Sequence, residues 1–468
     1  MILSKFNHKV EPKLKYFKAD PFSGVPGNLF SLSIVPVVVL ANHLHKLFPW
    51  PFHGLVQDIK KGQCTEWIME KKYKESCEKI LNHAKSHGFG IFNKLNHLAV
   101  KRSEQFRVQA ARLISKLPSL SNGDLKRAYD AFLQIYTDKY GIGITTFLFE
   151  HILSERLHAS LSARHEKAAM FIHQALHSRY KSFMTKSDEA LLKIKREKNR
   201  RQKDKLVDSY LDEHFFSHTS YEYSPRMTKK RITELASKTV PSANRQKEQN
   251  QRIVFSLDST EKHIIGLLKI AEAMRDLRKK INSIGNYTMF RFLDEASRRS
   301  GVPIKIAENI FYFEYAQLLD SPKTAAARAK RRRFCTVLFD GKRPRYFEQN
   351  VLKPNNPLKI TEVKGTPASI GAGKIRAPAK IILAKSDFGK LRAGDVLITQ
   401  MTRPNFLPIM KRAAAIVTDE GGLTSHAAIV SRELGIPCIV GTRYATKAFK
   451  NGELIEVNAH EGTVIKIG

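Results

Sequence analysis

The hydrophobic positions between residues 56 and 320 recur mostly at three- and four-residue steps, with little glycine or proline among them. This spacing places the apolar side chains on one face of an α-helix. The clearest stripe lies within residues 262–281 and consists of Ile264, Leu267, Leu268, Ala271, Met274, Leu277 and Ile281. The pattern predicts a mainly helical domain over residues 56–349, with two short strands near its end and one long, exposed, basic connection that contains Lys193–Lys205.

The pattern changes on both sides of this domain. Residues 1–55 contain six prolines, which exclude a continuous helix and predict an extended arm. Residues 350–378 are rich in proline and glycine and predict a linker that acts as a hinge. Residues 379–468 contain short apolar runs that predict strands at 381–384, 396–399, 414–418, 438–440, 454–457 and 464–467.

One helix is predicted inside the strand-rich unit, from Ser425 to Leu434, because Gly435 and Pro437 would end it. The predicted fold class is therefore multidomain, with a mainly helical N-terminal and central region followed by a C-terminal domain of strands and helix. A unit of this size with so much valine, isoleucine and alanine can form its own core.

Composition narrows the class of protein. The chain has 468 residues with a globular share of apolar side chains, and its formal net charge is +36. Four cysteines without CxxC spacing exclude a disulfide scaffold and a cysteine-type zinc site. The most apolar stretch, residues 29–41, is too short to span a bilayer, and the N-terminus does not resemble a signal peptide. We therefore expect a cytoplasmic protein with no membrane segment.

The start of the predicted C-terminal helix combines features that suit phosphate chemistry. Gly421 and Gly422 permit a tight turn with close approach of a ligand to the backbone. Thr424 and Ser425 supply hydroxyls at the helix N-terminus, which favours anions. The same positive end disfavours imidazolium, so we expect a neutral, nucleophilic His426 that accepts a phosphoryl group, with Gly421, Gly422 and Ser425 binding the phosphate. The alternative is a histidine that only caps the helix.

A longer pattern surrounds this histidine. It comprises Gly394-Asp-Val-Leu-Ile-Thr, Gly421-Gly-Leu-Thr-Ser-His-Ala-Ala-Ile-Val and Arg432-Glu-Leu-Gly-Ile-Pro. With these motifs, residues 365–468 resemble the swivelling phosphohistidine domain of phosphoenolpyruvate-utilising enzymes such as phosphoenolpyruvate synthase, pyruvate phosphate dikinase and rifampicin phosphotransferase. The resemblance implies a β/β/α domain that swings between two active sites of a phosphotransferase similar to pyruvate, water dikinase. It also implies that His426 is the carrier and that Thr424 orients it.

The source of the phosphoryl group is the open question in this resemblance. The family takes it from ATP on a large nucleotide-binding domain or from phosphoenolpyruvate on a barrel. No glycine-rich nucleotide loop is recognisable in residues 56–320, and residues 368–375 depart from a phosphate loop at Ala368 and Ile375. We therefore expect no cofactor in this chain, ATP and Mg²⁺ on a separate ATP-grasp-type nucleotide-binding protein, and a small pyruvate-like acceptor. On this interpretation the chain is incomplete alone; the alternative is a self-contained transferase with an unrecognised nucleotide site in the helical domain.

Two further patterns support other interpretations. Five histidines recur along one helical face, and Glu155 precedes one of them by three residues, which would suit a metal or acidic ligand; the simpler interpretation is a solvated polar face. The histidines are His151, His158, His165, His173 and His177.

Basic runs at Lys193–Lys205 and Arg328–Arg333 would suit nucleic acid phosphates, although no nucleic-acid-binding motif accompanies them. The alternative function is therefore a basic nucleic-acid-binding or regulatory protein that retains the carrier fold.

Overall fold

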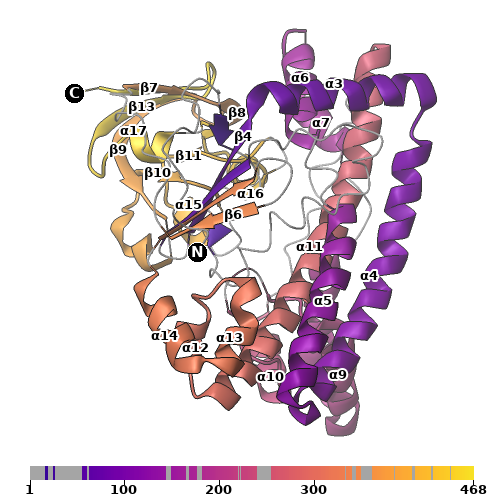
Figure 1. The fold of residues 1–468 in the computed structure, drawn as a ribbon. Coiled ribbons are helices and arrows are strands. Elements are labelled where there is room, and N and C mark those ends of the chain that lie inside the picture. Colours follow the sequence, from indigo (N-terminus) through magenta and orange to yellow (C-terminus); the bar gives the residue numbers. More distant parts are fainter. Residues whose placement is uncertain are drawn as a thin grey trace. The chain divides into compact units, whose positions relative to one another are not determined.

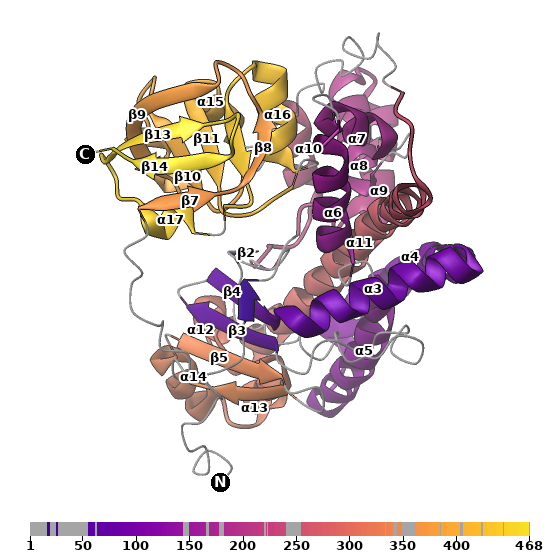
Figure 2. The same cartoon turned by 90° about the horizontal axis from the view of Figure 1, so that it is seen from above.

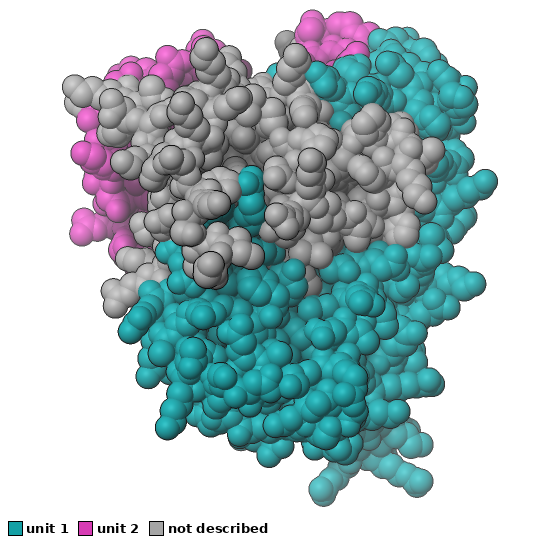
Figure 3. Space-filling model, viewed as in Figure 1, with its two compact units in different colours: residues 1–17, 25–150, 176–351 teal, residues 18–24, 151–175, 352–468 magenta. Residues whose placement is uncertain are grey.

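The computed structural model describes most of the chain and groups it into two compact units (Figure 3). The first unit contains residues 1–17, 25–150 and 176–351, and the second contains residues 18–24, 151–175 and 352–468. The described residues are 16–18, 25–26, 55–60, 63–143, 149–164, 168–176, 182–219, 221, 223–239, 254–332, 334–339, 344–348, 361–383, 385–402, 406–422, 425–442 and 444–467. Of the predicted arm over residues 1–55, only two short strands and the first residue of a third belong to this set.

Helices dominate the first unit, as the sequence predicts. They are α3 (Glu70–His87), α4 (Gly90–Lys116), α5 (Asn122–Gly143), α8 (Phe183–Arg196), α9 (Arg200–His214), α10 (Lys229–Lys238), α11 (Ser259–Ser300), α12 (Ile304–Ala307), α13 (Tyr315–Asp320) and α14 (Pro322–Arg331). The apolar stripe that predicts a helix over residues 262–281 lies in α11, which continues for 42 residues. Among the described helices, none is long and apolar enough to cross a bilayer.

The core of the first unit forms where α4, α5 and α11 run side by side (Figure 1). Helix α11 begins with a capping box made by Asp258 and Glu261, and it ends at Gly301 in the left-handed conformation. Tyr136 of α5 is fully buried and donates a hydrogen bond to Asn282 Oδ1 of α11 over 2.9 Å. This hydrogen bond pairs two polar side chains inside the bundle, as burial in an apolar core requires.

Two predictions in this unit are wrong. Residues 55–69 form a hairpin, β3 (Leu55–Lys60) and β4 (Gln63–Met69), rather than the start of the helical region. The basic run Lys193–Lys205 is not a long connection, because it forms the last turn of α8 and the first turns of α9. Only residues 197–199 separate the two helices, and the Asn199 side chain caps α9 by accepting from the Gln202 N–H.

The hairpin belongs to a six-stranded sheet with the order β1-β4-β3-β5-β6, and β2 also pairs with β4. The remaining strands are β1 (Tyr16–Lys18), β2 (Val25–Pro26), β5 (Phe334–Phe339) and β6 (Pro344–Phe347). Strands β5 and β6 confirm the two short strands predicted near the end of the helical region. Arg332, which precedes β5, is buried against Glu314, so this member of the second basic run pairs inside the protein.

The second unit is built on an eight-stranded mixed sheet with the order β7-β14-β13-β9-β10-β11-β12-β8. Its strands are β7 (Glu362–Lys364), β8 (Thr366–Ser369), β9 (Lys374–Ile381), β10 (Val396–Thr399), β11 (Ala415–Thr418), β12 (Cys438–Val440), β13 (Leu454–Asn458) and β14 (Thr463–Lys466). Strands β9 to β12 run parallel and the others pair antiparallel. Every residue of β10 and β11 is buried, so these two strands form the centre of the core.

Helices cover this sheet (Figure 2). Helix α16 (His426–Leu434) contacts β8, β11 and β12, and α17 (Ala445–Ala448) contacts β7, β10 and β11. Ile439 packs in one apolar cluster with Ala445 of α17, whereas the Cys438 side chain contacts Ser431 of α16. Because neighbouring residues of a strand point to opposite faces, α16 and α17 cover opposite faces of the sheet. The unit also contains α15 (Leu407–Met410). It further includes α6 (Glu150–Ser162) except its first residue and α7 (Ala168–Leu176) except its last residue.

The prediction of a linker over residues 350–378 is wrong for its second half. Strands β7, β8 and the start of β9 occupy most of residues 362–378, and residues 349–360 lie outside the described set. Pro378 misled the prediction because it lies inside β9, where proline is unusual. It stands at the point where β9 ends its pairing with β13 and begins its pairing with β10, which limits the cost of its missing N–H. The predicted domain boundaries otherwise stay predictions.

Candidate functional site

The candidate site lies at the carboxyl ends of the parallel strands β10, β11 and β12. Because parallel strands end at the same edge of a sheet, the residues that follow Thr399, Thr418 and Val440 gather there. This edge is where open α/β sheets usually bind ligands. Gly421 and Gly422 follow β11 by a few residues, and Gly441 directly follows β12.

Hydrogen bonds fix the backbone as it leaves β11. The Thr418 carbonyl accepts from both the N–H and the hydroxyl of Thr442, each over 3.0 Å. Asp419 is buried, and its carboxylate accepts from the Thr446 N–H over 3.0 Å and from the Thr446 hydroxyl. The Glu420 N–H donates to the Gln400 carbonyl over 2.9 Å. The chain therefore enters the glycine turn from a rigid support made by three strands and α17.

Gly421 is required by both the conformation and the space of the turn. Its φ is +105°, a value that residues with a side chain rarely adopt. A Cβ atom added at Gly421 would lie 2.9 Å from both Cβ and Oγ of Ser425. Gly422 differs, since an added Cβ would meet no atom within 4 Å. The Ser425 N–H donates to the Gly422 carbonyl over 2.9 Å, which closes the turn onto the start of α16.

Ser425 is the N-cap of α16, as the sequence predicts. Its backbone is extended, with φ −70° and ψ 160°, and its hydroxyl accepts from the Ala428 N–H over 3.3 Å. The helix ends at Gly435 in the left-handed conformation, which also confirms the predicted end. Its other attachment is Arg432, whose guanidinium donates to the Ala368 carbonyl over 3.2 Å. The start of α16 is therefore held by the glycine turn, and its last turn is held by the sheet.

His426 is the first residue of α16, directly after the cap. The structure describes its backbone only, and Thr424 lies outside the described residues. Of the predicted site residues, Gly421, Gly422, Ser425 and the backbone of His426 are thus brought together in one turn. Their roles in binding or carrying phosphate stay predictions.

Cys438 is not suited to act as a nucleophile. It begins β12, is fully buried and faces α16. Burial raises the pKa of its thiol to about 12, which keeps the thiol protonated near neutral pH.

The glycine-rich stretch 368–375 is not a nucleotide loop. It forms the turn between β8 and β9, in which the Gly373 N–H donates to the Ile370 carbonyl over 2.8 Å. A strand follows it, whereas a phosphate loop is followed by a helix. Lys374 pairs instead with the Glu456 carboxylate over 3.1 Å. The structure thus confirms that this segment is no phosphate loop.

The three described histidines of the stripe lie on two separate helices. His151 and His158 lie in α6 and His173 lies in α7, whereas His165 and His177 lie outside the described residues. Burial lowers the pKa of His158, which favours its neutral form. Within the described ranges, no three histidine, cysteine, aspartate or glutamate side chains gather into a group that could hold a metal.

Sequence reasoning missed the residues that support the site. Asp419, Thr442 and Thr446 hold the end of β11, but none belongs to the glycine–histidine pattern. One signal could have found Asp419, because it directly follows an apolar run that reads as a buried strand. A carboxylate at such a strand end commonly accepts hydrogen bonds from the next connection.

Comparison with known proteins identifies the C-terminal region. Residues 391–462 match the family described as PEP-utilising enzyme, mobile domain, which confirms the resemblance inferred from the motifs. Phosphoenolpyruvate synthase of Pyrococcus furiosus is 56% identical over 106 residues, which cover 22% of this chain and 12% of that relative. The probable phosphoenolpyruvate synthase of Archaeoglobus fulgidus is 52% identical over 104 residues, covering 22% and 13%. Phosphoenolpyruvate synthase of Neisseria meningitidis serogroup B is 47% identical over 103 residues, covering 22% and 12%.

This chain therefore matches only about an eighth of the length of these curated relatives. Among solved structures, the crystal structure of Thermococcus kodakaraensis aconitase X covers 23% of this chain and 98% of its own, at 17% identity and a TM-score of 0.19. That similarity is too low to carry an argument.

Proposed function

We propose that this protein is a phosphotransferase component in which His426 carries a phosphoryl group from a donor site to a small-molecule acceptor. The observation that supports the proposal is the place of His426. It directly follows the Ser425 cap and the glycine turn, within the residues that match the mobile domain of phosphoenolpyruvate-utilising enzymes. The relatives are named phosphoenolpyruvate synthase, which favours pyruvate or a similar small acid as the acceptor.

The start of α16 has the chemistry that a bound phosphoryl group needs. A helix begins with backbone N–H groups that lack partners within the helix, and phosphate oxygens accept hydrogen bonds from such groups. In α16 the Ser425 hydroxyl takes the Ala428 N–H, and no acidic side chain in the first turn opposes an anion. The Gly421 turn brings the backbone close to Ser425, and Gly422 leaves open space beside it. We propose that Gly421, Gly422 and Ser425 bind the phosphate and that Thr424 orients His426.

The transfer takes place in two steps, and in each step one bond to phosphorus forms while another breaks. In the first, a nitrogen of neutral His426 attacks the phosphorus of the donor, a P–N bond forms, and the donor's P–O bond breaks with its electron pair on the leaving oxygen. In the second, an oxygen of the acceptor attacks the same phosphorus, a P–O bond forms, and the P–N bond returns its electron pair to the imidazole. Donor and acceptor sites need not adjoin if the domain that carries His426 moves between them.

We further propose that the donor site lies on a separate ATP-grasp-type protein, which would hold ATP and Mg²⁺, with phosphoenolpyruvate as the alternative donor. The support is that the one glycine-rich segment resembling a nucleotide loop forms a β-turn in the sheet. A self-contained transferase would instead accept label from ATP without any partner.

The donor can be tested with the full chain. The purified protein is incubated with ³²P-labelled ATP and Mg²⁺, or with ³²P-labelled phosphoenolpyruvate, each with and without a dialysed extract of the source cells. We expect weak labelling alone and strong labelling when the extract is present. Strong labelling by ATP alone would contradict a separate donor protein while keeping the carrier, and an unlabelled protein in every arm would contradict the carrier itself.

A further inference from the structure

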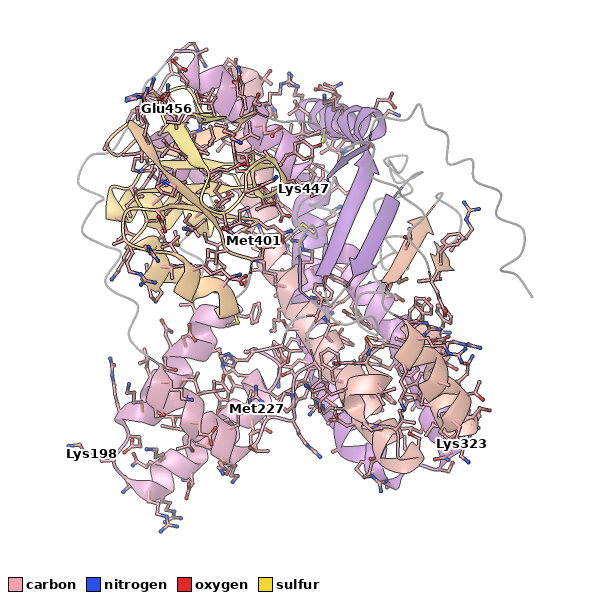
Figure 4. All side chains as sticks on the ribbon, turned by 90° about the vertical axis from the view of Figure 1, so that its left-hand side faces the viewer. Lys198, Met227, Lys323, Met401, Lys447 and Glu456 are labelled. Carbon is pink, nitrogen blue, oxygen red and sulfur yellow. The ribbon has the colours of Figure 1, made fainter. Side chains whose placement is uncertain are left out.

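The turn between α8 and α9 concentrates positive charge at one end of a helical pair. Its residues 193–205, here called the basic tip, contain eight cations and two acids. Seven of the cations are exposed and Lys203 is half-buried. The cations are Lys193, Lys195, Arg196, Lys198, Arg200, Arg201, Lys203 and Lys205. Lys198 lies on the turn at the outer end of the pair and points away from it (Figure 4).

Within the described residues, the protein does not neutralise this charge. Lys195 donates to the Thr239 carbonyl over 2.8 Å, but the other seven cations make no hydrogen bond or ion pair with any part of the described chain. Glu197, which could pair with them, accepts instead from the Asn199 N–H over 2.7 Å. Other surface cations of the first unit do find partners, as Lys126 does with Asp320 over 2.7 Å.

Some of these cations also lie where they destabilise a helix, at the start of α9. Arg200 and Arg201 occupy the first turn of α9, where the positive end of the helix dipole disfavours cations, and that turn contains no acidic residue. Mutual repulsion among the neighbouring cations adds to this cost. An external anion placed at the tip would relieve both effects, and a polyanion would do so for several cations at once.

We propose that the basic tip binds the phosphate backbone of a nucleic acid, in addition to the proposed phosphotransferase role and independently of it. Charge complementarity favours this partner, because phosphates recur along a duplex at a spacing of about 3.4 Å per strand and meet several cations together. A membrane surface fits less well, since peripheral helices insert apolar side chains beside their cations. The only apolar residue of the tip, Ile194, is buried.

Such binding reads charge rather than base sequence. Contacts to phosphates position a protein without specifying bases, and the tip contains no aromatic side chain for stacking. If about five cations meet phosphates, the logarithm of the binding constant should fall with the logarithm of salt concentration with a slope of about −4 to −5.

The test uses the full chain and a fluorescent, mixed-sequence DNA duplex of about 20 base pairs, two helical turns. The test variant is Lys198→Glu, Arg200→Glu and Arg201→Glu. The control variant is Lys323→Glu, Lys330→Glu and Arg331→Glu on α14, which changes the net charge equally at exposed cations that also lack partners in the described chain. We expect the test variant to bind at least tenfold more weakly and its salt slope to fall by about three, one for each cation.

Unfolding of the test variant should not account for a loss of DNA affinity. Glutamates at residues 200 and 201 lie at the positive end of α9, so the test variant should melt no lower than the unmodified protein. Equal losses of affinity in the test and control variants would overturn the proposal in favour of a general effect of net charge. Binding to vesicles with anionic lipid but not to the duplex would overturn it in favour of a membrane. His426→Asn should bind the duplex unchanged, so the two proposals fail separately.

Discussion

Gly421 and Ser425 approach so closely that only a hydrogen atom fits between them. A Cβ at residue 421 would lie 2.9 Å from Cβ and Oγ of Ser425, and the φ of +105° at Gly421 is rare for any residue with a side chain. The same serine caps α16 and precedes His426. The turn, the cap and the proposed carrier residue therefore form one unit, in which the position of each depends on the others.

This dependence predicts the effect of Gly421→Ala. The substitution must strain the backbone and displace Ser425, so we expect the free energy of unfolding to fall by about 1–3 kcal/mol and phosphoryl transfer to slow markedly. Chemical denaturation and ³²P labelling measure the two effects. The matched control is Gly422→Ala, because an added Cβ there meets no atom within 4 Å. Equal losses of stability in the two variants would contradict the role given to the close approach.

Removal of the helix cap is the second test. Ser425→Ala loses the acceptor for the Ala428 N–H, and we expect the free energy of unfolding to fall by about 0.5–2 kcal/mol. Labelling should also slow, because the hydroxyl is proposed to bind the phosphate. Ser425→Thr keeps the hydroxyl and should restore most of both properties. A Ser425→Ala protein that labels at the normal rate would remove Ser425 from the site.

The buried pair of Arg332 and Glu314 predicts a dependence of stability on pH. The Arg332 Nη2 atom lies 2.6 Å from Glu314 Oε1, and Nη1 also contacts Oε2, while both side chains are buried. Burial alone would raise the pKa of Glu314, but hydrogen bonds from Arg332 and from the Phe311 N–H lower it below the ordinary value of 4.5. The ionised Glu314 therefore stabilises the fold above that value, and this contribution is lost as the pH falls through the lowered pKa.

We accordingly expect Glu314→Gln to cost less near pH 7 than the roughly 3–5 kcal/mol of a fully unpaired buried charge, because Arg332 loses one carboxylate but keeps its ion pair with Glu348 over 2.6 Å. The difference from the unmodified protein should stay constant at neutral pH and shrink as the pH falls below about 4.5. Denaturant titrations across this range measure it. Asp320→Asn, which breaks an exposed pair with Lys126, should cost less than about 1 kcal/mol at any pH. A Glu314→Gln difference that does not depend on pH would contradict this account.

The paired strands β7 and β8 exclude part of the predicted linker as a hinge. Strand β7 pairs with β14 and β8 pairs with β12, so residues 362–369 are bound into the sheet and cannot serve as a hinge. We therefore propose that the hinge precedes Glu362, and we expect limited proteolysis to cut first within residues 350–360. The released C-terminal fragment should stay folded, which circular dichroism can check. First cuts between β8 and β9 would contradict the revised hinge.

The sequence predicted the surroundings of His426 better than the rest of the fold. Strand β10, strand β12 and the two ends of α16 follow from local signals, namely buried apolar runs, a serine cap and a left-handed glycine. Strands β7 to β9 could not be predicted in this way, because glycine and proline there resemble a linker and only pairing with distant strands keeps them extended. The β3–β4 hairpin likewise depends on β5, more than 250 residues away in the chain.

At the basic tip, the sequence predicted a connection where the structure forms two helices. Lys193–Lys205 lacks an apolar stripe of its own and reads as a connection, yet it continues two helices whose buried faces lie elsewhere along their length. Ile194 and Val207 anchor its two sides in the core, and Asn199 caps the second helix. Composition alone hides such a turn, because charged residues with high helix propensity fit a helix as well as a loop.

The central claim is that His426 carries the phosphoryl group, and the most direct measurement locates the label on the protein. The chain is labelled with ³²P under the conditions that give the strongest signal, and the modified residue is mapped by digestion and mass spectrometry at alkaline pH. We expect a phosphoramidate on His426, stable to alkali and labile to acid. His426→Asn should abolish it without changing the melting temperature, and Thr424→Ala should slow it by roughly 10²–10³ if Thr424 acts as one positioned donor. The control, His460→Asn, alters an exposed histidine of the same domain and should label normally. Label that persists in His426→Asn, or acid-stable label that maps to Ser425, would contradict the account.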